Sequence, residues 1–155
     1  MVDLFTQRIN KLEASFRLLL NSSPSFPDDI PKTTPKAGIY LFTDNNRHLY
    51  VGRSNDIPRR LRRHCSGGKT WKGASFAFRL ARESTNNHKA SYKSKGSRED
   101  LMSQPAFANA FFAAKARIRK MSVRFIEEKD PVQQALLEIY VADKLQTPHN
   151  DFDNH

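Results

Sequence analysis

Two short runs of strand-forming residues, joined by a polar turn, constrain the fold of this chain more than any other feature. Residues 38–43 read Gly-Ile-Tyr-Leu-Phe-Thr and residues 48–53 read His-Leu-Tyr-Val-Gly-Arg, with Asp44-Asn45-Asn46 between them. Aromatic and β-branched residues favour strands, whereas Asp and Asn favour tight turns. The segment therefore predicts an antiparallel hairpin, so the chain must build at least a small sheet.

Helical patterns surround this hairpin. Apolar residues recur at helical spacing over 3–20, and a linker with four prolines follows at 21–36. The segment 74–83 alternates like a strand at its aromatic positions, but its many alanines favour a helix. Further helices are expected over 57–65, over 98–120 with a break at Pro105, and over 131–145, and a third strand is expected over 121–128. The pattern predicts a mixed α/β (α+β) chain, divided into an N-terminal helix with its linker (1–36) and a domain (37–155).

Positive charge is concentrated in the middle of the chain. Residues 47–98 hold fourteen Lys or Arg against two acids, which gives +12, while the rest of the chain is −2. A localised positive field suits a polyanion, most often nucleic acid, although a solvated basic surface is the plainer alternative. The basic residues expected to contact DNA are Arg53, Arg59, Arg63, Lys69 and Lys72.

Several classes of protein are disfavoured by composition. The one cysteine, Cys65, permits no intrachain disulfide and no four-cysteine zinc site. No apolar run approaches the roughly 18 residues of a membrane span, and the N-terminus lacks the pattern of a secretory signal. We therefore expect no membrane association and a cytoplasmic location.

Three groups of residues are candidates for chemistry. Tyr40 and Tyr50 lie on the two strands of the hairpin, where they can approach one another. Arg60 and His64 are four residues apart and share a helix face. Glu138 is the one acid of the apolar segment 132–141, where a carboxylate is costly unless something satisfies it. Taken singly, these residues are better explained by structural roles: surface aromatics, phosphate-binding arginines, a surface histidine and a solvated glutamate.

Together these residues form a recognisable pattern. Gly38-Ile39-Tyr40 and, ten residues after this tyrosine, Tyr50-Val51-Gly52 resemble the two-part signature of the GIY-YIG nuclease superfamily. The resemblance continues at Arg60 in the next helix, at His64 (a His or Tyr in the restriction-enzyme branch), at Glu138 and at Asn150. It covers about residues 38–150, and it departs from the family pattern at Val51, where the name-giving motif has Ile, and over 66–97, which matches no family element.

The resemblance implies a three-stranded antiparallel sheet flanked by helices, and hydrolysis of a DNA phosphodiester. Glu138 is then expected to hold a single Mg²⁺ or Mn²⁺ ion, and Arg60 to pair with the scissile phosphate. Tyr40 is expected to act as the base for the water while Tyr50 orients the water or the phosphate, although the two roles are exchangeable. A free tyrosine has a pKa of about 10, so the base needs nearby positive charge.

The resemblance implies supporting roles for two more residues. His64 is expected to assist proton transfer or contact phosphate, and Asn150 to fix Glu138 or a phosphate through its amide. DNA is the expected partner, and a stand-alone domain of this kind would act as a monomer or a weak homodimer. One alternative is a nucleic-acid-binding module of the same fold without cleavage; another is a metal site in the tail, formed by His149, Asp151, Asp153 and His155.

Overall fold

A computed structural model describes residues 1–66, 74–87 and 97–153. Along the chain it contains α1 (Leu4–Asn21), β1 (Gly38–Asp44), β2 (Arg47–Ser54), α2 (Ile57–Cys65), α3 (Ser75–Ser84), α4 (Arg98–Met102), α5 (Pro105–Arg119), β3 (Ser122–Glu127) and α6 (Pro131–Leu145). The predicted fold class is confirmed: the strands form one three-stranded antiparallel sheet flanked by helices, with an additional N-terminal helix. The ambiguous segment at 74–83 is helical, and the break expected at Pro105 separates α4 from α5.

The sheet has the order β2-β1-β3, so β1 is the central strand. The hairpin turns at Asn45 and Asn46, whose φ angles of 51° and 63° lie in the left-handed region that asparagine tolerates. In the register, Tyr40 lies opposite Gly52 and Phe42 lies opposite Tyr50. The two tyrosines are therefore diagonal neighbours rather than a directly opposed pair.

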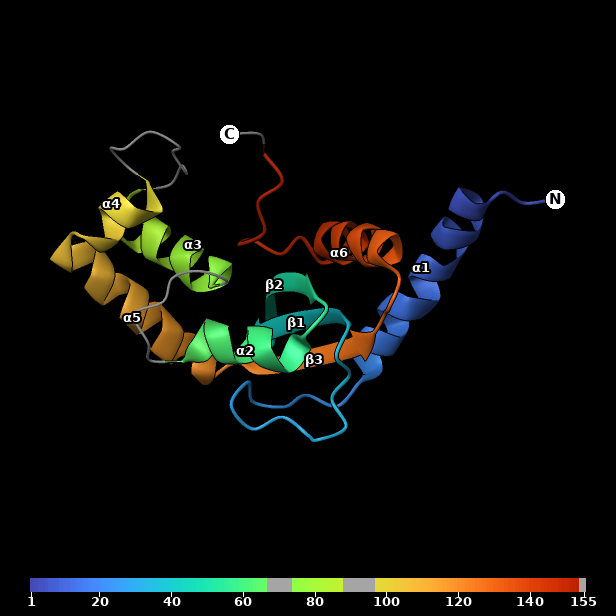
Figure 1. Ribbon diagram of the computed structural model, residues 1–155, viewed down its shortest axis with the longest axis horizontal. Helices are drawn as coiled ribbons and strands as arrows, with labels where there is room; N and C mark the ends of the chain where they lie inside the picture. The colour runs from blue at the N-terminus through green and yellow to red at the C-terminus, as the bar shows by residue number, and fades with distance from the viewer. Residues whose placement is uncertain (67–73, 88–96, 154–155) are drawn as a thin grey trace.

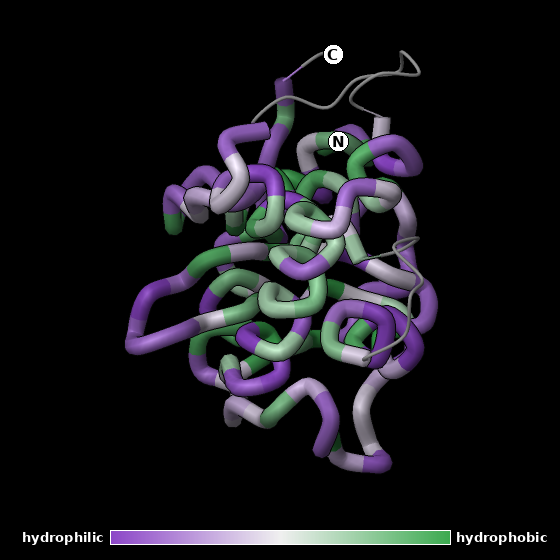
Figure 2. Tube along the Cα trace, turned by 90° about the vertical axis from the view of Figure 1, so that its left-hand side faces the viewer, coloured by the Kyte–Doolittle hydropathy of each residue, from purple (hydrophilic) through white to green (hydrophobic). Residues whose placement is uncertain are grey.

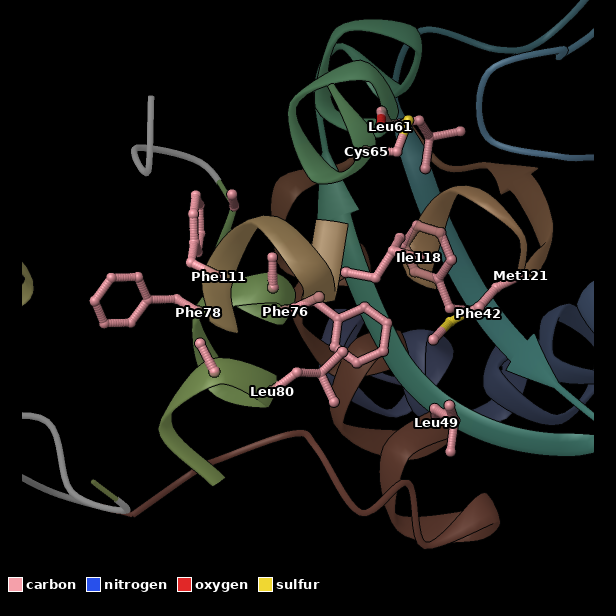
Figure 3. Packing of buried hydrophobic residues seen from close by; sticks show 14 of the residues in the cluster. Phe42, Leu49, Leu61, Cys65, Phe76, Phe78, Leu80, Phe111, Ile118 and Met121 are labelled. Atoms are coloured by element: carbon pink, nitrogen blue, oxygen red, sulfur yellow. Dashed lines mark hydrogen bonds between the residues drawn. The ribbon is translucent and has the colours of Figure 1, made fainter. Parts of the chain in front are cut away.

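Helices cover both faces of the sheet (Figure 1). On one face, Tyr40 and Phe42 of β1 belong to a core that includes residues of α2, α3 and α5. Figure 3 shows part of this core, with Phe76 of α3 among residues from the sheet and α5. On the other face, Ile39 and Leu41 pack with residues of α1 and α6. Because β1 is covered on both sides, its apolar residues run nearly without interruption.

The N-terminal helix is part of this second core. Leu12, Phe16 and Leu19 of α1 are buried in the cluster that contains Leu137 and Val141 of α6. The amphipathic pattern thus places α1 on the domain, while the division at residues 36 and 37 stays a prediction. Figure 2 shows hydrophilic residues concentrated on the outer loops. Within the described residues, no helix combines the length and the apolar character needed to cross a membrane.

Candidate active site

Tyr40 and His64 form a buried pair at the centre of the site. Tyr40 projects from β1 and is 1 % exposed, and its Oη lies 2.9 Å from Nε2 of His64 in α2. Burial, together with the charges of Arg60 and Lys115, lowers the pKa of His64 to about 3, so its imidazole is neutral at neutral pH. Nδ1 of His64 is buried and has no hydrogen-bond partner in the described part of the chain. The Tyr40 hydroxyl is therefore the partner on which this imidazole depends.

Tyr50 lies beside the same imidazole. Its ring centroid is 5.9 Å from that of His64, and it stacks on Phe76 at 4.6 Å with an interplanar angle of 3°. Burial and the negative charge of Glu138 raise the pKa of Tyr50 to about 12, while the charges of Arg60 and Arg98 oppose the rise. Burial, with Tyr50 and Glu138, also raises the pKa of Tyr40, and Arg60 lowers it. The two predicted tyrosines therefore share one electrostatic environment.

Gly52 makes room for the Tyr40 ring. A Cβ atom at this position would overlap Cζ and Oη of Tyr40, which lies opposite on β1. The glycine of the second motif is thus required by a close approach rather than by a turn.

Glu138 and Arg60 reach the site from two different helices. Glu138 is half-buried on α6, and burial raises the pKa of its carboxyl while the charges of Arg53 and Arg60 lower it. In the described part of the chain, this carboxylate has no hydrogen bond and no ion pair within 4 Å. A half-buried carboxylate without a partner, with arginines nearby to bind an anion, fits a divalent cation that keeps most of its water. The described residues contain no cluster of three His, Cys, Asp or Glu side chains suited to a metal.

The loop between β2 and α2 is anchored to α6. Asp56 caps α2 by accepting a hydrogen bond from the Arg59 N–H, as its type and position predict. Gln134 is buried in α6 and donates to Oδ1 of Asn55 at 3.2 Å and to the Glu128 carbonyl at 2.6 Å. Sequence reasoning missed Gln134, although it precedes Glu138 by one helical turn within the same apolar segment and so shares its face.

The side chain of Asn150 forms hydrogen bonds with the backbone of β2. Its Oδ1 accepts from the Val51 N–H at 2.9 Å, and its Nδ2 donates to the Val51 carbonyl at 2.8 Å. Oδ1 also accepts from the Thr147 hydroxyl at 2.8 Å. The amide completes the outer edge of the strand that carries Tyr50, and its expected role in fixing Glu138 or a phosphate stays a prediction.

The residues predicted to contact DNA are only partly brought together. Arg53 is exposed near the first turn of α6, with Nη1 3.5 Å from the Pro131 carbonyl. Arg59 is exposed and Arg63 half-buried on α2. Lys69 and Lys72 lie outside the described residues. Of the tail residues proposed as metal ligands, His149 and Asp151 lie close to Glu83 and Arg79 of α3, and His155 lies outside the described residues.

The fold is that of a small mixed α/β domain, and it brings the candidate site residues together from its sheet and helices. The model of the GIY-YIG catalytic domain matches residues 36–150. The chain therefore belongs to the GIY-YIG family, and the resemblance drawn from its motifs is confirmed. Family membership implies nuclease-type activity on nucleic acid. Neither the curated proteins nor the solved structures compared with the chain contain a match.

The buried imidazole of His64 makes stability depend on pH. Because its pKa falls from 6.5 to about 3 on folding, the unfolded chain binds more protons below pH 6.5. Stability contributed by the neutral ring is present above pH 6.5 and is lost as the pH falls toward 3. Between pH 6.5 and 4.5 we expect a loss of about 2–3 kcal/mol from this group.

Urea unfolding at both pH values measures this loss. His64→Gln provides the comparison, because an amide can pair with Tyr40 but does not titrate. The difference in unfolding free energy between the two pH values should be smaller in the variant. Equal pH dependence in both proteins would contradict a neutral, buried His64.

Proposed function

We propose that this chain is a metal-dependent DNA endonuclease that hydrolyses a phosphodiester with one divalent ion. One observation carries the proposal: the model of the GIY-YIG catalytic domain matches residues 36–150, and within it α6 presents Glu138 as a half-buried carboxylate with no hydrogen bond or ion pair among the described residues. Aromatic hydroxyls, a fixed cation and an unpaired carboxylate are the groups that phosphodiester hydrolysis requires.

The charge distribution supports DNA as the substrate. The segment 47–98, which holds +12, includes all of β2, α2 and α3. Arg59 and Arg62 are exposed on α2, the helix that supplies Arg60 to the site. A phosphate backbone that crosses α2 would therefore reach Arg60 and the tyrosines, and its binding would weaken as salt is raised.

Arg60 and the two tyrosines have complementary tasks. The guanidinium of Arg60 binds the scissile phosphate and keeps its charge at any accessible pH. Tyr40 must first release its hydroxyl proton to solvent, and as the phenolate it then accepts the proton of the attacking water, while Tyr50 orients that water or a phosphate oxygen. Burial holds both hydroxyls in the neutral form in the free chain, so positive charge is needed to favour the phenolate. Arg60 supplies part of that charge, and neutral His64 fixes the position of the Tyr40 hydroxyl.

Glu138 would hold the metal ion, either Mg²⁺ or Mn²⁺. Its carboxylate is the acid whose charge reaches both tyrosines. A divalent ion bound there would supply positive charge that stabilises the leaving 3′ oxygen. Burial disfavours the ionised carboxylate, and this cost is offset when a cation is bound.

Supercoiled plasmid incubated with Mg²⁺ or with EDTA tests the proposal. Wild-type protein should relax or linearise the plasmid only with the metal, and Glu138→Gln should reduce the rate by at least about 100-fold. Glu127→Gln, at an exposed position on β3, is the matched control and should cleave normally. Cleavage in EDTA or unchanged cleavage by Glu138→Gln would overturn the metal role. Salt-sensitive binding without strand breaks, on plasmid and on branched DNA, would instead identify a binding module.

A further inference from the structure

We infer that residues 147–151, here called the C-terminal strap, and the facing side of α3 form a device that positions Tyr50. Within it, Arg79, Glu83, His149 and Asp151 are positioning residues that hold the Tyr50 ring relative to Glu138. The inference rests on the proposed function, because it assigns these residues a part in the same reaction. It extends the site to α3, which contributes none of the predicted catalytic residues.

The strap covers the free edge of β2 on both sides of Tyr50. The backbone N–H of His149 donates to the Leu49 carbonyl at 3.2 Å. The Asn150 amide makes its two hydrogen bonds to Val51 at 2.9 and 2.8 Å. The residues before and after Tyr50 are therefore both fixed by the strap, although within residues 1–66, 74–87 and 97–153 no further strand pairs with this edge.

The Tyr50 ring is supported by α3. It stacks face to face on Phe76, whose centroid lies 4.6 Å away. The ring of His149 lies 5.7 Å from Phe76. Phe76 is fully buried, so it has little freedom to follow a displaced tyrosine. A shift of the strap against α3 would thus be transmitted to Tyr50 through its backbone and through its stacking partner.

One ion pair and one contact of a neutral imidazole fasten the strap to α3, because burial lowers the pKa of His149. Arg79 lies 2.9 Å from Glu83 through Nε and 3.2 Å from Asp151 through Nη1, and Nδ1 of His149 lies 2.9 Å from Oε2 of Glu83. The four side chains are 14–29 % exposed, so solvent screens them less than the surface pair of Arg17 and Glu13. Asp151 is thereby held by Arg79 of α3, and Glu83, which orients Arg79, also lies beside the ring of His149, whose Nδ1 has no hydrogen-bond partner among the described residues.

The strap also connects Tyr50 to Glu138. It begins directly after α6, the helix that carries Glu138, and passes beside β2 toward α3 (Figure 1). The distance between the proposed metal ligand and Tyr50 is consequently set by a short segment held at both ends. A misplacement of about 1 Å in such a site can cost about 100-fold in rate.

Two substitutions that each remove one charge test the device. Glu83→Gln and Asp151→Asn weaken the link between α3 and the strap, and Glu127→Gln and Asp153→Asn make the same charge change elsewhere. Removing a negative charge anywhere on the protein strengthens its binding to DNA, and the two control variants measure this general effect. We expect kcat for plasmid cleavage to fall 10- to 100-fold in the first pair, with KM within about threefold of the controls.

A tyrosine spectrum separates this inference from the nuclease proposal. In protein labelled with ¹³C at tyrosine Cζ, the signal lost in Tyr50→Phe identifies Tyr50 among the four tyrosines. This signal should move in Glu83→Gln and Asp151→Asn and stay in place in both controls, whether or not DNA is cleaved. An unmoved Tyr50 signal in two folded variants, or control-like kcat in an active enzyme, would overturn the positioning role. Absence of cleavage by the wild type would overturn only the proposed function.

Discussion

Tyr40→Phe is expected to reduce plasmid cleavage by about 10²- to 10⁴-fold, the usual range for loss of a general base. The substitution removes the hydroxyl that faces His64 and leaves the ring in its pocket. Single-turnover cleavage rates measure the effect, since they are insensitive to product release.

The same substitution should also lower stability. Without the Tyr40 hydroxyl, Nε2 of His64 has lost its partner, and Nδ1 has none among the described residues. A buried polar group that is left unpaired costs about 1–3 kcal/mol, so urea unfolding should report a loss of that size.

Tyr140→Phe is the control for both measurements. Tyr140 donates a hydrogen bond to Glu13 on α1, and it likewise loses one hydroxyl. It should retain cleavage within about twofold, because its hydroxyl lies outside the proposed site. Nearly normal cleavage by Tyr40→Phe would remove Tyr40 as the base and favour Tyr50 in that role.

The fold was predictable where local residue preferences and burial agree. The asparagine turn and the flanking aromatic residues predict the hairpin, and Pro105 predicts the break between α4 and α5. The segment at 74–83 was harder to assign, because Phe76, Phe78 and Leu80 alternate as in a strand, whereas the neighbouring alanines follow a helical face. All three residues are buried in α3. Because this helix is buried on more than one side, its apolar residues follow neither the two-residue spacing of a strand nor the spacing of an amphipathic helix.

The candidate site was predictable as a set of residue types but not as a set of contacts. Tyr40, Tyr50, Arg60, His64 and Glu138 follow from motif spacing, whereas their roles remain predictions. Asn150 bonds to backbone atoms of Val51, and the His149 N–H bonds to the carbonyl of Leu49, each about a hundred residues away. A backbone group has no side-chain signature, so only the folded chain reveals such contacts.

Gly52→Ala should be the most disruptive single-methyl change in the site. The added Cβ would overlap the Tyr40 ring, which is 1 % exposed and bonded to His64, so the ring has no free space to enter. Overpacking of this kind costs about 1–3 kcal/mol, and displacement of the hydroxyl should lower cleavage by about 100-fold. Urea unfolding and single-turnover rates measure the two effects.

The clash between the added Cβ and the Tyr40 ring also predicts that a smaller side chain at position 40 reduces the loss of stability caused by Gly52→Ala. Leucine at position 40 lacks the ring atoms that meet the new Cβ, so Gly52→Ala should destabilise a Tyr40→Leu protein far less than the wild type. Gly38→Ala is the matched control, because its Cβ would meet the Ile126 carbonyl, a backbone atom that Tyr40→Leu leaves in place. Equal costs for Gly52→Ala in both backgrounds would show that Gly52 acts through the backbone of β2. A selective rescue would establish that this glycine is required by the ring of Tyr40.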